Sequence, residues 1–254
     1  MASSSAPVSV GSISIGGNVE GNIVVGNNNF IYTVHTYYGA LVDRPAAPSV
    51  KRRRLKQSPP RQLQGFVGRA GDLDKLTNYI KSKDAVLVHG HDGIGKTTLV
   101  RQAANSDPAK AMPDGVVYLQ GVDEKGQALG MQDTVQLLFD ALYESNPPLK
   151  VNPAGARTYL NNTQPLVILN RFEFSGAGLN DLADMLPKGA LVVTSRNAPG
   201  DDDLQHLGLL PLAREDSIQL LINKSGTATD GAMRVVCDKI CELLGDVPLA
   251  ISKI

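Results

Sequence analysis

Residues 90–97 read Gly90-His91-Asp92-Gly93-Ile94-Gly95-Lys96-Thr97, and a second threonine, Thr98, follows directly. The stretch fits the pattern GxxxxGK[ST] of a phosphate-binding loop, and an apolar run typical of a buried strand precedes it. Its glycines let the backbone curl so that consecutive N–H groups point at phosphate oxygens, and a helix from Lys96 would add its positive amino end. We expect this stretch to contact a bound nucleotide, with Lys96 on the β- and γ-phosphates and the Thr97 hydroxyl on Mg²⁺.

The sequence around this loop alternates short β-branched runs with longer segments of helical periodicity, which is typical of helices that cross over a parallel sheet. Strands are expected at residues 85–89, 116–120, 166–170, 190–194 and 207–210. Helices are expected at residues 72–82, 96–105, 131–144, 154–161, 179–186, 214–224 and 231–244. The pattern predicts a three-layer α/β P-loop NTPase domain with a five-stranded parallel sheet at residues 65–212, followed by a small helical subdomain at residues 213–254.

Composition narrows the class of protein. The 254 residues include 25 Lys and Arg against 25 Asp and Glu, a balance that excludes a sequence-independent polyanion binder. Cys237 and Cys241 lie one helical turn apart, a spacing that predicts reduced core thiols and not a zinc site. The start of the sequence lacks the basic and apolar segments of a secretory signal, and no apolar run approaches the ~18 residues that cross a bilayer, so we expect a cytoplasmic protein.

The amino-terminal quarter of the chain contains two segments whose compositions differ from that of the rest. Residues 1–42 contain Gly, Asn and Ser between β-branched residues, with a ten-residue echo of residues 12–18 at 22–28, and they predict either a disordered tail or stacked strands. Residues 43–64 are rich in proline and include the run Lys51-Arg52-Arg53-Arg54, which predicts an extended linker. The same run also fits a nuclear address or a nucleic-acid patch.

Two predicted strands end in residues that bear on chemistry. The strand at residues 166–170 ends in Asn170, an amide at the position where a Mg²⁺-binding carboxylate normally follows such a loop. Weak or absent ATP hydrolysis is therefore expected, although Glu173 could substitute if the strand ended late. The strand at residues 190–194 leads into Arg196 at the carboxyl edge of the sheet, where an arginine can sense the γ-phosphate.

Five motifs occur in order along residues 65–254 and together resemble the NB-ARC nucleotide-binding module of STAND ATPases, the switch of plant resistance proteins and apoptosome scaffolds. They are Phe66-Val67-Gly68-Arg69, the phosphate loop, the strand at residues 166–170, Thr194-Ser195-Arg196 and Asp246-Val247-Pro248-Leu249-Ala250. The resemblance implies that Val67 and Arg69 lie beside the adenine and ribose, that Pro248 packs against the adenine, and that Lys96, Asn170 and Arg196 occupy the catalytic positions. Two departures stand out: Asp246 replaces a glycine, and Asn170-Arg171 replaces an acidic pair.

Residues 23–31 resemble the core of the RIP homotypic interaction motif and related amyloid signalling motifs. The positions that carry the likeness, and would form the assembly motif, are Ile23, Val25, Gly26, Asn29 and Ile31, while Val24 stands where glutamine is usual. Alternating β-branched residues with almost no charge are also what a dry β-zipper requires. The likeness implies self-association as a homo-oligomer and a downstream effector with a similar motif.

We therefore expect an ATP- or ADP-binding signalling switch of immune or cell-death type that oligomerises and templates amyloid-like assembly. The sequence ends at Ile254, directly after the last motif, so the family's winged-helix and sensor domains are expected to be missing. The alternatives are a genuine P-loop ATPase with a passive tail and a P-loop protein that handles nucleic acid through residues 51–56. A GTPase is disfavoured because Asn223-Lys224-Ser225-Gly226 lacks the acid that recognises guanine.

Overall fold

The computed structural model describes residues 48–53, 59–61, 65–122, 127–198, 200–226 and 231–254. The segment predicted at residues 1–42, with its assembly motif, lies outside them. Within the described residues, five strands form a parallel sheet, which confirms the predicted fold class. From one edge to the other, the strands are β3 (Val116–Gln120), β5 (Leu166–Asn170), β6 (Ala190–Ser195), β2 (Ala85–His89) and β7 (Gln205–Gly208).

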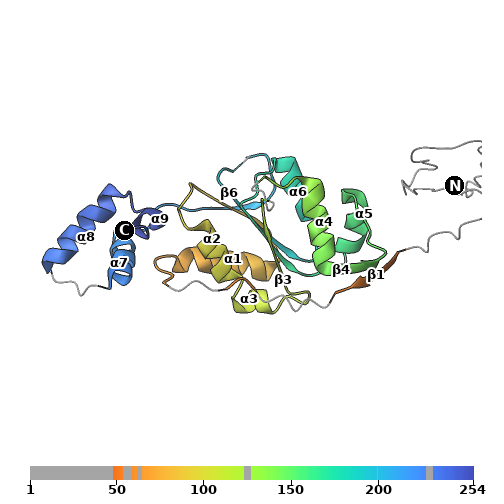
Figure 1. The fold of residues 1–254 in the computed structure, drawn as a ribbon, viewed down its shortest axis with the longest axis horizontal. Coiled ribbons are helices and arrows are strands. Elements are labelled where there is room, and N and C mark those ends of the chain that lie inside the picture. The colour runs from red at the N-terminus through yellow and green to blue at the C-terminus, as the bar shows by residue number, and fades with distance from the viewer. Residues whose placement is uncertain (1–47, 54–58, 62–64, 123–126, 199, 227–230) are drawn as a thin grey trace, which may run out of the picture. The chain divides into compact units, whose positions relative to one another are not determined.

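Helices cover both faces of this sheet, so that the domain has three layers (Figure 1). One layer holds α1 (Ala70–Ser82), α2 (Lys96–Ala103) and α3 (Asp107–Lys110), and the other holds α4 (Met131–Leu142), α5 (Pro153–Leu160) and α6 (Gly176–Met185). Successive strand residues alternate between two apolar cores: Val86 and Val88 pack with the first layer, and Leu87 packs with the second. This two-sided burial explains why the strands read as continuous apolar runs in the sequence.

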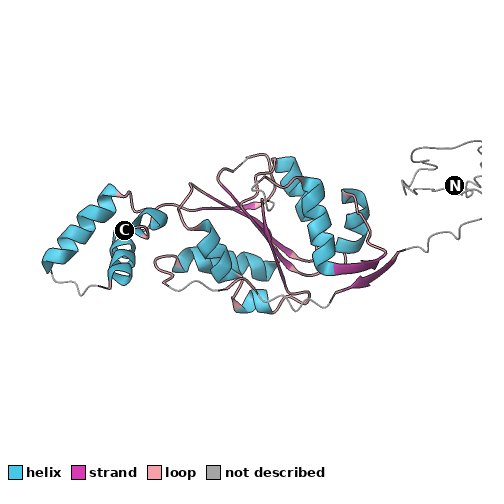
Figure 2. Cartoon of the chain, in the orientation of Figure 1, coloured by secondary structure: helices cyan, strands magenta, loops and turns pink. Residues whose placement is uncertain are grey.

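A separate group of helices follows the sheet, namely α7 (Arg214–Ser225), α8 (Gly231–Leu243) and α9 (Pro248–Ile251) (Figure 2). Their own small core contains Ile218, Leu221 and Ile251. Cys237 and Cys241 are buried in it as free thiols. Among the described residues, no helix combines the length and apolar character that a membrane crossing requires.

The segment predicted as a linker contains a strand. β1 (Ser49–Arg52) pairs in antiparallel fashion with β4 (Tyr143–Asn146), and Arg52 forms an ion pair with Asp114. Arg53 donates from Nε to the carbonyl oxygen of Tyr143 at 3.1 Å. The basic run could not reveal this strand, because the pairing depends on backbone groups and on acidic partners far away in the sequence.

Several element boundaries also differ from the predictions. The helix predicted to run to residue 144 ends at Leu142, where the chain enters β4. The helix predicted to run to residue 105 ends at Ala103, and α3 begins after it because the Ser106 side chain accepts from the N–H of Ala109. β7 lies at residues 205–208, two residues earlier than predicted.

Candidate nucleotide-binding site

The loop of residues 90–97 joins β2 to α2 at the carboxyl edge of the sheet. Gly90, Gly93 and Gly95 have φ values of 142°, 81° and 104°, a region that only glycine enters without strain. Among the described residues, no side chain caps the amino end of α2, which begins directly after Gly95. The N–H groups of its first turn have no partner inside the helix, so they can bind an anion.

Lys96 is buried in this loop, with 8% of its surface exposed. Its Nζ donates to the carbonyl oxygens of Gly90 and His91, the second at 3.0 Å. Burial lowers the pKa of Lys96, while the negative charges of Asp92 and Glu173 act in the opposite direction. The ammonium group is thus held against the loop by carbonyl groups that a phosphate could replace as its partner.

Asn170, at the end of β5, is the centre of a buried polar network. Its Oδ1 accepts from the hydroxyls of Thr97 and Thr194, each at 3.0 Å, and its Nδ2 donates to Gln120 Oε1 at 3.0 Å. The structure therefore brings Asn170 next to Thr97. The network links the carboxyl ends of β3, β5 and β6 to the start of α2.

Arg196 follows β6 and lies beside the loop. Its Nε is 3.0 Å from Asp92 Oδ2, and both side chains are largely exposed. Glu173 holds the backbone of this turn, because its two carboxylate oxygens accept from the Arg196 N–H at 3.0 Å and from the Ser195 hydroxyl at 2.8 Å. Sequence reasoning considered Glu173 only as a substitute metal ligand and missed its role in positioning Arg196.

Arg69 is the buried residue that ties the loop to its surroundings. Its guanidinium donates to the carbonyl oxygens of Ile94 and Leu210, at 2.9 and 2.6 Å, and forms an ion pair with Asp72 at 3.0 Å. These contacts fix one loop carbonyl and the segment after β7. Val67 is half-buried two residues earlier, at the start of this segment.

The helix α9 lies against the phosphate loop. The N–H of Leu249 donates to the carbonyl oxygen of Gly93 at 3.1 Å. A Cβ at Gly93 would lie only 2.9 Å from Leu249 Cβ, and one at Gly95 would lie 4.0 Å from Pro248 Cγ. Pro248 is thus close to the loop, and a direct contact joins the helical subdomain to the site.

Asp246, the residue that replaces a glycine of the resembled motif, has a φ of 56°. A left-handed backbone explains why glycine suits this position. The Asp246 carboxylate accepts from the Arg214 guanidinium at 2.8 Å, a contact that glycine could not make. The turn between α8 and α9 therefore forms here although Asp246 replaces the glycine.

Arg171 is a further residue at the site that sequence reasoning did not single out for binding. It has a left-handed backbone, with a φ of 64°, and its N–H donates to Thr194 Oγ1 at 2.8 Å. The positive charges of Arg171 and Arg196 both lower the pKa of Lys96, after burial, which has the largest effect. The sequence does carry a signal for Arg171, because a basic residue stands where the resembled module has the second residue of an acidic pair.

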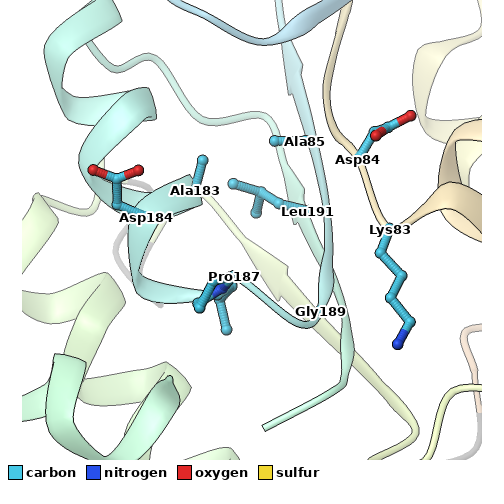
Figure 3. A pocket seen from close by; sticks show the side chains of 9 residues that line it. Lys83, Asp84, Ala85, Ala183, Asp184, Pro187, Gly189 and Leu191 are labelled. Atoms are coloured by element: carbon cyan, nitrogen blue, oxygen red, sulfur yellow. The ribbon is translucent and has the colours of Figure 1, made fainter. Parts of the chain in front are cut away.

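A hollow lies at the opposite end of the strands, at the amino ends of β2 and β6, with a volume of about 300 Å³ (Figure 3). Lys83, Asp84 and Asp184 stand apart from one another around it. The Lys83 ammonium donates to Gln164 at 3.0 Å. No group of charges converges there among the described residues, so the phosphate loop remains the candidate site.

The residues at the loop fit a nucleotide better than they fit a tightly held metal ion. The glycine backbone, the uncapped helix and Lys96 all suit phosphate oxygens. Mg²⁺ in such a site needs a nearby carboxylate in addition to the Thr97 hydroxyl, and Asn170 supplies a neutral amide there. The donor set therefore suits the phosphates of the predicted ATP or ADP, and for the predicted Mg²⁺ it offers the Thr97 hydroxyl beside an amide in place of the usual carboxylate.

Comparison with protein-family models and with curated proteins gives no match. Among solved structures, the Walker-type ATPase of Pyrococcus abyssi is similar with a TM-score of 0.53 and 14% identity, over 76% of this chain and 68% of that one. A STAND protein with a tetratricopeptide repeat sensor from Pyrococcus horikoshii aligns with a TM-score of 0.47 and 18% identity, over 77% of this chain and 30% of that one. Drosophila ORC bound to DNA aligns with a TM-score of 0.48 and 14% identity, over 73% of this chain and 54% of that one.

The likeness to the Walker-type ATPase, together with the loop and the parallel sheet, defines the fold as that of a P-loop ATPase. The chain spans less than two thirds of the STAND and ORC chains. At these identities the likeness concerns the fold alone.

Proposed function

We propose that this chain is an ATP- or ADP-binding switch of the NB-ARC type found in STAND proteins. The observation that carries the proposal is the contact between α9 and the phosphate loop, in which the Leu249 N–H donates to Gly93 at 3.1 Å. A nucleotide that reshapes this loop must also change the contact, so its binding is coupled to the position of the helical subdomain.

A second link supports this coupling. Arg69 holds the carbonyl oxygen of Ile94, the residue directly after Gly93. Two successive carbonyl groups of the loop are therefore bound by groups from outside it, one from the segment before α1 and one from α9. Because each bond has a defined geometry, the loop cannot rearrange without breaking or moving at least one of them.

Turnover is proposed to be weak or absent. Asn170 cannot act as a carboxylate toward a metal ion or an attacking water, since it is a neutral amide. The nearest candidate to replace it, Glu173, uses both carboxylate oxygens to hold Ser195 and Arg196. Binding and release of nucleotide, with little chemistry, suit a switch.

The output of the switch is proposed to lie in the amino-terminal motif, with residues Ile23, Val25, Gly26, Asn29 and Ile31. In this proposal the nucleotide-bound copies associate with one another, and their motifs seed an amyloid-like assembly with a cytoplasmic effector of similar sequence, in immune or cell-death signalling. The alternating β-branched pattern and low charge support the assembly step.

Calorimetric titration of the full chain with ATP and ADP tests the nucleotide step. We expect saturable binding that Lys96→Ala abolishes and that Lys110→Ala, an exposed lysine on α3, leaves intact. Hydrogen exchange at residues 247–251 should change on binding, because α9 contacts the loop. A chain that binds neither nucleotide, or binds one with no change at α9, contradicts the switch.

One observation favours a second candidate, a genuine ATPase with a passive tail. The negative charge of Glu173 raises the pKa of Lys96, so a carboxylate acts on the residue expected to contact the phosphates. Turnover that Lys96→Ala removes and that deletion of residues 1–42 leaves unchanged would identify this function. The third alternative, contact with nucleic acid through the basic run, is weakened because Arg52 and Arg53 already have acidic partners, Asp114 and Glu144.

A further inference from the structure

The carboxyl edge of the sheet carries an unusual set of charges for a P-loop site. We propose that the chain binds ATP without a divalent cation, because Asn170 and Arg171 replace the carboxylates that would hold one and Arg171 supplies positive charge beside the phosphates. This inference rests on the proposed function, in that the loop must bind an adenine nucleotide.

The amide oxygen of Asn170 has no lone pair left to accept from a metal-bound water. A side-chain amide oxygen has two lone pairs, and both are used here by the hydroxyls of Thr97 and Thr194. The amide nitrogen donates to Gln120 and can only donate. With Asn170 1% exposed, solvent cannot easily replace these partners. The network therefore closes the position from which a carboxylate would attract the ion.

The two nearby carboxylates are also engaged. Glu173 accepts from the backbone N–H of Arg196 and from Ser195, so release of either oxygen would free the turn that carries Arg196. Asp92 lies 3.0 Å from the Arg196 guanidinium. Glu173 cannot turn toward a metal ion without giving up the Ser195 hydroxyl and the Arg196 N–H, which costs free energy. Asp92 would give up its exposed ion pair with Arg196, at a smaller cost.

Positive side chains are available to balance the phosphate charge instead. Arg171 directly follows Asn170, and the bond from its N–H to Thr194 fixes its left-handed backbone at the strand end. Arg171 itself is exposed, and its charge is felt at Lys96, as is that of Arg196. An exposed guanidinium can donate paired hydrogen bonds directly to phosphate oxygens. A hydrated ion donates such bonds only through the water molecules that it binds.

Titration of the full chain with ATP, in EDTA and in excess Mg²⁺, tests the proposal. We expect the two dissociation constants of the wild type to agree within about threefold, whereas a site that needs the ion should lose at least about a hundredfold in EDTA. Arg171→Ala should weaken ATP binding about tenfold in EDTA, from the loss of a charge-assisted contact. The matched control Arg157→Ala, a half-buried arginine on α5, should leave binding unchanged.

Asn170→Asp provides the opposite change at nearly constant shape. The two threonine hydroxyls can still donate to a carboxylate, and melting curves check that the variant folds. We expect weaker ATP binding in EDTA, because the carboxylate repels the phosphates, and recovery of about tenfold or more when Mg²⁺ is added.

The outcomes separate this inference from the proposed function. Wild-type binding that appears only with Mg²⁺ overturns the inference and leaves the switch intact. An Arg171→Ala variant with unchanged affinity in EDTA overturns the role of Arg171. Absence of ATP binding under both conditions refutes the proposed function, and the inference with it.

Discussion

Replacement of Arg69 by methionine removes the buried guanidinium that joins the phosphate loop to its surroundings while keeping most of the apolar stem. The side chain loses bonds to Ile94 and Leu210 at 2.9 and 2.6 Å and an ion pair with Asp72 at 3.0 Å. Hydrogen bonds of charged groups contribute about 1.5–3 kcal/mol each, and the two carbonyl groups left behind lose their partner. The buried Nε of Arg69 has no partner, so methionine also removes an unfavourable group and part of the loss is offset. We therefore expect the free energy of unfolding to fall by about 3–4 kcal/mol.

Urea denaturation followed by far-ultraviolet circular dichroism measures this loss, since the chain has no tryptophan. Arg69→Lys should recover less than half of it, because a single ammonium cannot reach both carbonyl groups and Asp72 with the geometry of the guanidinium. The control Arg157→Met, whose ion pair with Asp181 is exposed at 3.9 Å, should change stability by less than about 0.5 kcal/mol. A loss below about 1 kcal/mol for Arg69→Met, or a lysine variant equal to the wild type, would refute the reasoning.

Three further predictions concern the same edge of the sheet. Asn170→Leu should lower the free energy of unfolding by about 2–4 kcal/mol in urea titrations, because it leaves two threonine hydroxyls without their acceptor. Gly93→Ala should lower the free energy of unfolding by about 1–2 kcal/mol because of its left-handed backbone, and by more because the new Cβ collides with Leu249. The control Gly226→Ala has a φ of 66° and open space around it, so melting experiments should show a smaller loss. Burial lowers the pKa of His89 from 6.5, so the unfolded chain binds the proton more readily and stability should fall as the pH drops below about 6.5. His89→Gln should flatten that slope in unfolding curves recorded between pH 5 and 7, and an unchanged slope would contradict the assignment.

Much of the central fold could be predicted because its signals are local. The strands β5 and β6 are buried along their whole length, so the apolar pattern marks them directly. The glycines of residues 90–97 mark a turn that needs positive φ values, and the parallel sheet then brings Asn170 and Arg196 to the same edge as the loop.

The features that escaped prediction depend on contacts between distant residues. β1 and β4 are short, largely polar strands without the apolar pattern that marks a buried strand. They also lie far apart along the chain, so the sequence does not indicate that they pair. The bonds from Arg69 to the carbonyl oxygens of Ile94 and Leu210 are contacts that no local sequence pattern reveals. The left-handed backbone of Arg171 could not be predicted either, because arginine rarely adopts a positive φ.

The pairing of β1 with β4 has a consequence for whatever the preceding residues bind. The chain is attached to the P-loop domain at Ser49, and again where Asn105 donates to the carbonyl oxygen of Pro60 at 2.9 Å. The four residues of β1 would span about 13 Å if they were free, and that length is withdrawn from the reach of the leading segment. An effective concentration is highest when a tether matches the span between two sites and vanishes when the tether cannot reach, so Ser49, and not Gly65, is the point from which any such span must be measured.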